Sequence, residues 1–176
     1  ELIKVLFGSM SGPTGLNSFR PLTSLGLLLD FIVWNTNPFG YHLTNIILFA
    51  GCCVCIAVLV TQLYFDQKYV KYLAAMLASI LFAAYPIHPE SVAWIIGRVD
   101  SQCTFFFLLS LICYFQFRKA GNYLQLIISL TFFFISLTTK EMAVVLPVVI
   151  FLAELLLASD LEWEQKGIFH RFKYPL

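Results

Sequence analysis

The sequence predicts an all-α, polytopic transmembrane helical bundle. Of its 176 residues, 60% are hydrophobic and 12% are charged, whereas soluble domains carry about 25% charged residues. The mean hydropathy is +0.83. Long apolar runs recur along the chain, and short polar segments separate them. These observations predict an integral, multi-pass membrane protein embedded in a lipid bilayer and argue against a water-soluble globule.

The apolar runs give the number of expected spans. A helix that crosses the hydrocarbon core of a bilayer needs about 20 mostly apolar residues. We expect five spans within a bundle over residues 42–159, at residues 43–65, 70–86, 102–117, 123–139 and 142–159. The last run contains Pro147, which a membrane helix tolerates because neighbouring groups satisfy the freed carbonyl.

The N-terminal residues 1–41 are expected to form an extracytoplasmic loop with a helix of its own. Residues 22–34 are apolar but only about half a span long. They follow Arg20 and end at the sequence NTNPFG, a strong turn signal. We therefore predict an interfacial helix over residues 22–34, lying along the membrane surface.

Basic residues predict the orientation, because they concentrate in cytoplasmic loops. The expected topology puts residues 66–71, 118–122 and 160–176 on one face. That face holds seven of the 11 lysines and arginines, so it is predicted to be cytoplasmic, with 160–176 as a cytoplasmic segment. The net charge of +1 and the lack of a basic block in the sequence argue against a nucleic-acid partner.

The opposite, extracytoplasmic face collects the polar side chains of interest. Ionisable residues at the mouths of membrane helices are costly to place and usually mark a functional site. A site in this protein is therefore expected to face outward. The residues are Arg20, His42, Asn45, His88, Glu90, Arg98, Asp100, Lys140 and Glu141.

A polar island at residues 88–100 is the most informative of these segments. Residues 91–99 are expected to form a short helix or a re-entrant turn after prolines that end the preceding helix. Trp94 and Arg98 then lie at i and i+4, where the indole could stack on the guanidinium. Arg98 offers a rigid fork of donors that suits a phosphate or a carboxylate. The alternative is an Arg98–Asp100 ion pair that anchors the membrane interface.

Two further motifs carry weaker signals. His42 and Asn45 lie at i and i+3, so they share one helix face, directed into the bundle or toward the interface. Lys140 and Glu141 interrupt two apolar runs and, as neighbours on a helix, face different partners. Lys140 either meets an anionic lipid headgroup or snorkels to the surface, and the sequence leaves both alternatives open.

The sequence identifies no cofactor and no metal site, and it leaves any divalent metal requirement undetermined. His88 and Glu90 suggest zinc, but a metalloprotease helix needs His-Glu-x-x-His on one face. Pro89 between the two residues prevents that geometry. The five cysteines lie inside apolar runs, where cysteine behaves as a small hydrophobic residue.

Four motifs occur in a characteristic order along the chain. They are residues 19–23 (FRPLT), 37–45 (NPFGYHLTN), 88–100 (HPESVAWIIGRVD) and 139–141 (TKE). Together they resemble the membrane region of the transmembrane and tetratricopeptide-repeat-containing O-mannosyltransferases and their bacterial relatives. Those proteins belong to the GT-C class of polytopic glycosyltransferases, and the resemblance runs through nearly the whole chain.

The resemblance implies an activity and its partners. A sugar, mannose in the animal members, would pass from a polyprenyl-phosphate-linked donor to a hydroxyl acceptor on a protein or glycan. The reaction would occur on the lumenal or periplasmic face, in the endoplasmic reticulum membrane or the bacterial inner membrane. By the GT-C pattern, the donor phosphate would contact Arg98 and Lys140, supported by Arg20 and His88. The residues that orient them or meet the acceptor would be Glu90, Asp100, Glu141 and His42.

One departure from the family pattern concerns the catalytic base. GT-C enzymes use an acidic residue in the first extracytoplasmic loop as the base on the acceptor. Glu1 is the only acid in residues 1–19, so the catalytic residue stays unknown and we expect it upstream of residue 1. A repeat domain is expected downstream. The sequence is therefore interpreted as a fragment of a longer chain that is inactive alone.

Two other functions compete with the glycosyltransferase. A polytopic transporter also places charges inside the membrane, but transporters often show internal repeats with broken helices near the midplane. The sequence shows no repeat, and its charges lie at helix ends. A catalytically inactive GT-C-like scaffold that binds lipid would keep the same motifs without turnover.

Overall fold

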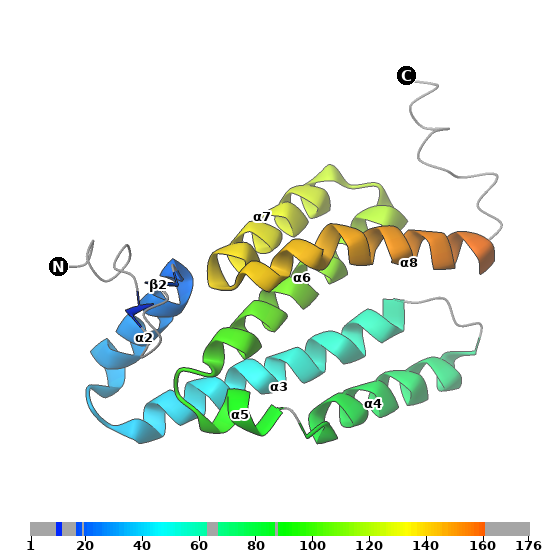
Figure 1. Ribbon diagram of the computed structural model, residues 1–176. Coiled ribbons are helices and arrows are strands. Elements are labelled where there is room, and N and C mark those ends of the chain that lie inside the picture. Colours follow the sequence, from blue (N-terminus) through cyan, green and yellow to red (C-terminus); the bar gives the residue numbers. More distant parts are fainter. Residues whose placement is uncertain (1–9, 12–16, 19, 63–66, 87, 161–176) are drawn as a thin grey trace. The chain divides into compact units, whose positions relative to one another are not determined.

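The computed structural model describes residues 10–11, 17–18, 20–62, 67–86 and 88–160. The chain divides into two units, residues 1–143 and 144–176, which are treated separately. The elements, drawn in Figure 1, are β1 (Met10–Ser11), β2 (Asn17–Ser18), α2 (Pro21–Trp34), α3 (Pro38–Gln62), α4 (Lys68–Ala84), α5 (His88–Ala93), α6 (Arg98–Ala120), α7 (Tyr123–Thr139), the 3-10 helix η1 (Glu141–Val145) and α8 (Leu146–Asp160).

The described residues are almost entirely helical, which confirms the all-α prediction. The exception, which the sequence did not predict, is an antiparallel pair of two-residue strands in which Met10 faces Ser18. Each of the five expected spans overlaps a helical segment, although residues 63–65 of the first expected span lie outside the described residues. Residues 123–139 match α7, and residues 142–159 divide into η1 and α8. The helix α8 begins at Leu146 because Pro147 is readily accepted in the first turn of a helix.

Among the described residues, two helices are long and apolar enough to cross a membrane, α3 and α6. α2 and α7 are apolar but shorter. The side chains also show an inverted distribution. Large apolar residues such as Ile47 on α3 and Phe134 on α7 are exposed, whereas Asn45 and Ser110 are fully buried. Polar side chains inside and apolar side chains outside suit a lipid surrounding, which agrees with a membrane location.

The helix α6 lies at the centre of the first unit, between α3 and α7 (Figure 1). It begins at Arg98, before the expected start at residue 102, so Asp100 falls in its first turn. A carboxylate there interacts favourably with the helix dipole. The helix ends at Gly121, whose φ of 67° is the left-handed conformation that glycine adopts readily. The side chain of Asn122 then accepts the Leu124 backbone N–H at 3.0 Å and starts α7.

Small polar residues hold α6 and α7 together. Ser110 and Ser129 exchange hydrogen bonds from each hydroxyl to the other backbone carbonyl, both at 2.8 Å. A second contact joins Ser136, whose hydroxyl donates to the Cys103 carbonyl at 2.9 Å. The two contacts are seven residues apart on each helix, as expected for antiparallel helices in close contact. Such small side chains let membrane helices approach closely.

The contact between α3 and α6 is apolar. Its buried centre consists of Cys52, Cys55, Leu108 and Ile112. All five cysteines are free, and Cys52, Cys55 and Cys103 are buried. They therefore pack as small hydrophobic residues, as the sequence predicts.

The serine pair yields a test of helix packing. Replacing Ser129 by Leu places a branched side chain where α7 meets α6, so we expect the free energy of unfolding to fall by about 1–3 kcal/mol. The control is Thr131→Leu, two residues along on the exposed side of α7, with an expected change within about 0.5 kcal/mol. Thermal unfolding of the protein in lipid nanodiscs measures both, and equal losses would contradict the assigned packing.

Candidate functional site

The first helix of the site, α2, carries a buried carboxylate to the start of α6. Asp30 forms an ion pair with Arg98 through its Oδ2 atom. Arg98 is 1% exposed and Asp30 is 7% exposed. A buried charge requires an opposite charge and full hydrogen bonding. The pair meets this requirement in part because Thr44 donates to the second carboxylate oxygen at 2.8 Å.

Asn45 on α3 completes the arrangement around Arg98. Its side-chain oxygen accepts a hydrogen bond from Arg98 Nε at 3.1 Å. Its Nδ2 atom donates to the backbone carbonyls of Val92 at 3.3 Å and Trp94 at 3.1 Å. One fully buried amide therefore fastens the end of α5 and the start of α6 to α3. We call Asp30, Asn45 and Arg98 the buried clasp.

The buried clasp corrects two predictions about the polar island. Arg98 pairs with Asp30 rather than Asp100, because Arg98 faces the interior while Asp100 is exposed. The expected stacking of Trp94 on Arg98 is also wrong. The helix α5 ends at Ala93, so Trp94 lies in the turn before α6 and is 56% exposed, and the i and i+4 geometry of a continuous helix does not apply to it and Arg98.

Asp30 is the residue that sequence reasoning missed. A signal was present, because Asp30 is a lone carboxylate inside the apolar run 22–34. An ionisable residue in such a run needs a partner. The apolar run 22–34 alone does not identify Arg98 as that partner, since Asp30 and Arg98 are far apart in the sequence.

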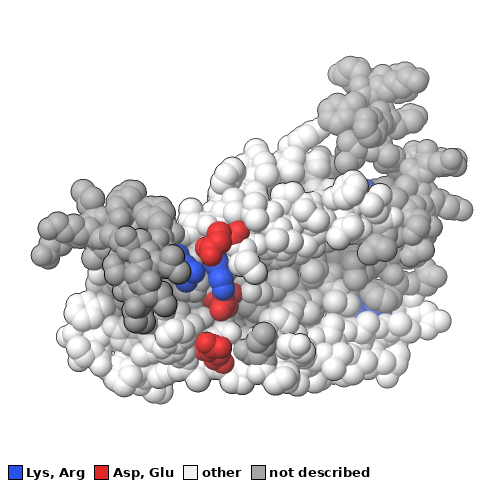
Figure 2. Space-filling view, viewed as in Figure 1, with Lys and Arg blue, Asp and Glu red and all other residues white. Residues whose placement is uncertain are grey.

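The exposed charges gather beside the buried clasp. Lys140 pairs with Asp100, and Arg20 Nη2 lies 3.9 Å from Glu141 Oε1. Figure 2 shows acidic and basic side chains adjoining on this face. Because Lys140 and Glu141 are neighbours in the chain, the two ion pairs lie side by side. We call these four residues the charged rim.

Arg20 has spare donor capacity in this rim. Its Nε atom is buried and has no hydrogen-bond partner among the described residues. At 3.9 Å, its pair with the exposed Glu141 is loose, and exposed pairs contribute little stability. The Arg20 guanidinium can therefore reorient toward an anion without breaking a buried interaction.

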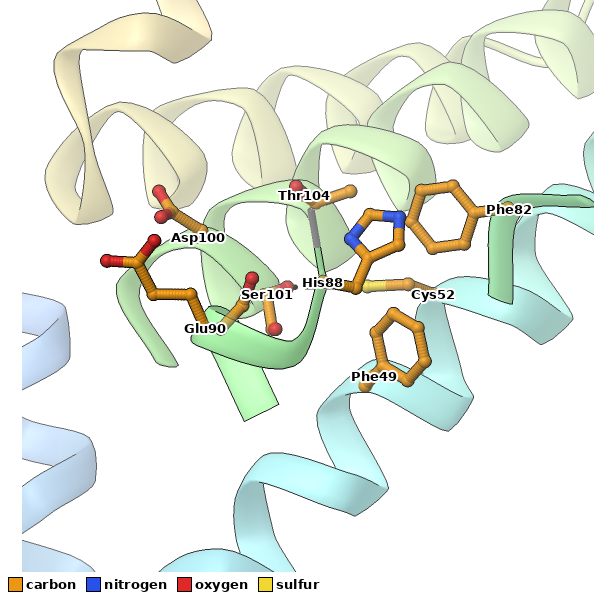
Figure 3. Close-up of a pocket in the computed structure, with 9 residues that line it drawn as sticks. Phe49, Cys52, Phe82, His88, Glu90, Asp100, Ser101 and Thr104 are labelled. Carbon is orange, nitrogen blue, oxygen red and sulfur yellow. Dashed lines mark hydrogen bonds between the residues drawn. The ribbon is translucent and has the colours of Figure 1, made fainter. Parts of the chain in front are cut away.

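A cavity of about 300 Å³ opens next to the charged rim, between α3, α4, α5 and α6. Its polar lining comes from Glu90, Ser91, Asp100, Ser101 and Thr104. Figure 3 shows the two carboxylates on one side of the cavity and aromatic rings on the other. The rings are those of Phe49, Phe82 and His88, with the His88 centroid 4.3 Å from that of Phe82 and 5.1 Å from that of Phe49.

The remaining predicted site residues take different places. His88 lies against the rings of the cavity, and Glu90 lies at its acidic side. His42 is half-buried on α3, while Asn45, expected on the same face, is fully buried. Within the described part of the chain, no three histidine, cysteine or acidic side chains are grouped to hold a metal ion.

The fold and the site together define a helical membrane protein with a charged site and a cavity at one end of its helices. Protein O-mannosyl-transferase TMTC2 of Mus musculus is 37% identical over 111 residues, which are 60% of this chain and 12% of that protein. TMTC4 of Mus musculus is 33% identical over 123 residues, 64% of this chain and 17% of that protein. TMTC3 of Homo sapiens is 34% identical over 131 residues, which are 74% of this chain and 14% of that protein.

These relatives confirm the resemblance that the four motifs predict. The chain is similar to one part of the protein O-mannosyl-transferases TMTC1 to TMTC4. The matched residues span 12–17% of the length of these proteins. No family model matches the chain, and no solved structure matches it.

The buried clasp gives the first test of the site. Replacing Asp30 by Ala leaves the Arg98 guanidinium buried without a counter-ion, so we expect the free energy of unfolding to fall by about 3–5 kcal/mol. Glu90→Ala removes an exposed carboxylate and should change stability by less than about 0.5 kcal/mol. Chemical unfolding in detergent micelles compares the two variants. A small effect of Asp30→Ala would show that Arg98 has water or another partner.

The close approach of α5 to α6 gives a second test. A Cβ atom added at Gly97 would lie 2.5 Å from the Glu90 carbonyl oxygen, a backbone atom that cannot move alone. We expect Gly97→Ala to lower the free energy of unfolding by about 1–3 kcal/mol and to displace α5. At Gly26 the nearest atom would be 3.6 Å away, so Gly26→Ala should be neutral or stabilise α2 by up to about 1 kcal/mol.

Amide hydrogen exchange across residues 88–97 checks the displacement. Faster exchange in Gly97→Ala with unchanged exchange in Gly26→Ala is the expected pattern. If both variants exchange alike, the contact between Gly97 and Glu90 does not position α5.

Proposed function

We propose that this chain forms part of a GT-C-type membrane glycosyltransferase. It would transfer mannose from a polyprenyl-phosphate donor to a hydroxyl acceptor on a protein or glycan. The observation that carries this proposal is the charged rim beside a polar cavity at one end of the helices. The names of the similar proteins, protein O-mannosyl-transferases, agree with a sugar-transfer role.

The proposed topology follows the helices. Five spans would be formed by α3, α4, α6, α7 and the segment of η1 and α8, with α2 as an interfacial helix. The cytoplasmic segment expected at residues 160–176 lies, apart from Asp160, outside the described residues. Seventeen-residue helices such as α4 and α7 extend about 25 Å at 1.5 Å per residue. They suit the hydrocarbon core when flanking Lys68 and Lys140 snorkel to the two surfaces. The charged rim then lies on the lumenal or periplasmic face.

The donor phosphate is assigned to the two cations of the charged rim. Lys140 and Arg20 both have partly exposed side chains, and their acidic partners are adjacent. A phosphate between them would accept charge-assisted hydrogen bonds from an ammonium and a guanidinium. Arg98 was expected at the phosphate, but its buried guanidinium already contacts Asp30 and Asn45. Its proposed role is to position the start of α6, and with it Asp100.

The acceptor is assigned to the acidic side of the same face. Glu90, Asp100 and Glu141 present carboxylates to solvent, and carboxylates accept hydrogen bonds from hydroxyl groups. They can therefore orient a hydroxyl acceptor next to a phosphate held by Lys140. His88 lies behind them at the cavity wall.

Substitution of Lys140 tests the proposal. Lys140→Met keeps the length of the side chain but removes the charge, so we expect mannosyl transfer from polyprenyl phosphate mannose to fall at least about 100-fold, the effect of losing about 2.7 kcal/mol. Lys68→Met, at the opposite end of the helices, is the matched control and should keep at least half of the activity. The intact protein in nanodiscs is assayed with radiolabelled donor.

Three results separate the alternatives. Loss of transfer in Lys140→Met with donor binding weakened supports the phosphate contact. Full activity in Lys140→Met removes Lys140 from the site. Donor binding by the wild-type protein without turnover under any condition overturns the transferase and favours a lipid-binding scaffold.

A further inference from the structure

We propose that the cavity between α3, α4, α5 and α6 binds the sugar of the lipid-linked donor. The inference rests on the proposed function, and it assigns the monosaccharide a place distinct from the phosphate. The chemical class of the ligand is a hexose with neighbouring free hydroxyl groups, attached through its first carbon to a lipid phosphate.

The size of the cavity suits one sugar ring. Small-molecule sites range from about 300 to 1,000 Å³, and this cavity, at about 300 Å³, is at the lower end. It accommodates a monosaccharide but leaves no room for a long polyprenyl chain. The chain would instead lie along the apolar outer surfaces of the helices.

The lining provides what a sugar ring needs. Glu90 and Asp100 supply carboxylate oxygens that accept hydrogen bonds from hydroxyls, and Ser91 and Thr104 add hydroxyls that donate and accept. On the other side, the rings of His88, Phe49 and Phe82 pack against one another and form an aromatic wall (Figure 3), which can contact the C–H face of a sugar ring. A wall of aromatic rings opposite a few polar groups is the usual composition of a small-ligand site.

The charge of the lining decides which part of the donor enters. Two carboxylates disfavour a phosphate in the cavity by like-charge repulsion. The phosphate instead stays at Lys140, whose partner Asp100 is also a cavity residue. Asp100 therefore borders both the cavity and the proposed phosphate position at Lys140. A sugar joined directly to a phosphate at Lys140 would reach the cavity by passing Asp100.

The buried clasp explains why the cavity has a fixed shape. Its acidic wall comes from the first turns of α5 and α6, and Asn45 fastens both segments to α3. Phe49 and Cys52 of α3 form the opposite wall. The two walls are therefore held at a constant separation.

Filling the cavity is the direct test. Thr104→Phe places a ring in the cavity from α6, and Thr138→Phe places the same ring on the exposed side of α7 as the matched control. Binding of polyprenyl phosphate mannose and of polyprenyl phosphate is measured for the intact protein in nanodiscs. Wild-type protein should prefer the mannosylated lipid by about tenfold, the effect of about 1.4 kcal/mol of sugar contacts.

The expected pattern is selective. Thr104→Phe should bind both lipids equally, because it loses the contacts with mannose and keeps the contacts with the phosphate. Thr138→Phe should keep the wild-type preference. Glu90→Gln, an isosteric change at an exposed side chain, should reduce the preference about threefold, and it keeps the proposal testable if Thr104→Phe fails to fold.

Other outcomes overturn the inference in distinguishable ways. Equal binding of the two lipids by the wild-type protein overturns the sugar site and leaves the phosphate contact standing. An unchanged preference in both Thr104→Phe and Glu90→Gln also overturns it. If the wild-type protein binds neither lipid, the proposed function fails, and the sugar site fails with it.

Discussion

The arrangement of the first unit depends on one buried charge, the guanidinium of Arg98. Removing a charged group from water is costly unless an opposite charge and hydrogen bonds replace the lost solvent. Asp30 supplies the charge and Asn45 an amide oxygen, and these come from two helices, α2 and α3, that contain no other Asp, Glu, Lys or Arg. Because both must reach Arg98, α2, α3 and the start of α6 can meet in few ways. A requirement for electrostatic compensation thus fixes the packing of three helices.

The rest of the site follows from this constraint. With Arg98 held inside, the same first turn of α6 presents Asp100 outward, where it meets Lys140 at the end of α7. The amide of Asn45 also donates hydrogen bonds to the carbonyls of Val92 and Trp94. These bonds fix the position of the short helix α5 relative to α6. The cavity and the charged rim share Asp100 because both include the first turn of α6. A buried arginine can in this way control the position of the exposed charged residues around it.

The polar interior and the apolar exterior fit one environment. In lipid, apolar association gives little driving force, and close packing of small side chains with hydrogen bonds between helices takes its place. The serine pairs between α6 and α7 and the small cysteines between α3 and α6 follow this pattern. Packing of this kind leaves the ion pairs of the charged rim at the ends of α6 and α7.

The sequence by itself determined the helical class and the approximate positions of the helices in the described part of the chain, because hydrophobic run length and turn residues are local signals. The resemblance to the TMTC proteins could be seen from four motifs as well. Only the tertiary structure decided the partners: Arg98 with Asp30, Lys140 with Asp100, and Asn45 with two carbonyls of the polar island. Spacing along one helix suggested Trp94 or Asp100 for Arg98. It failed because the helix is interrupted at Ala93, and a buried charge is neutralised by whichever helix packs against it, however distant in the chain.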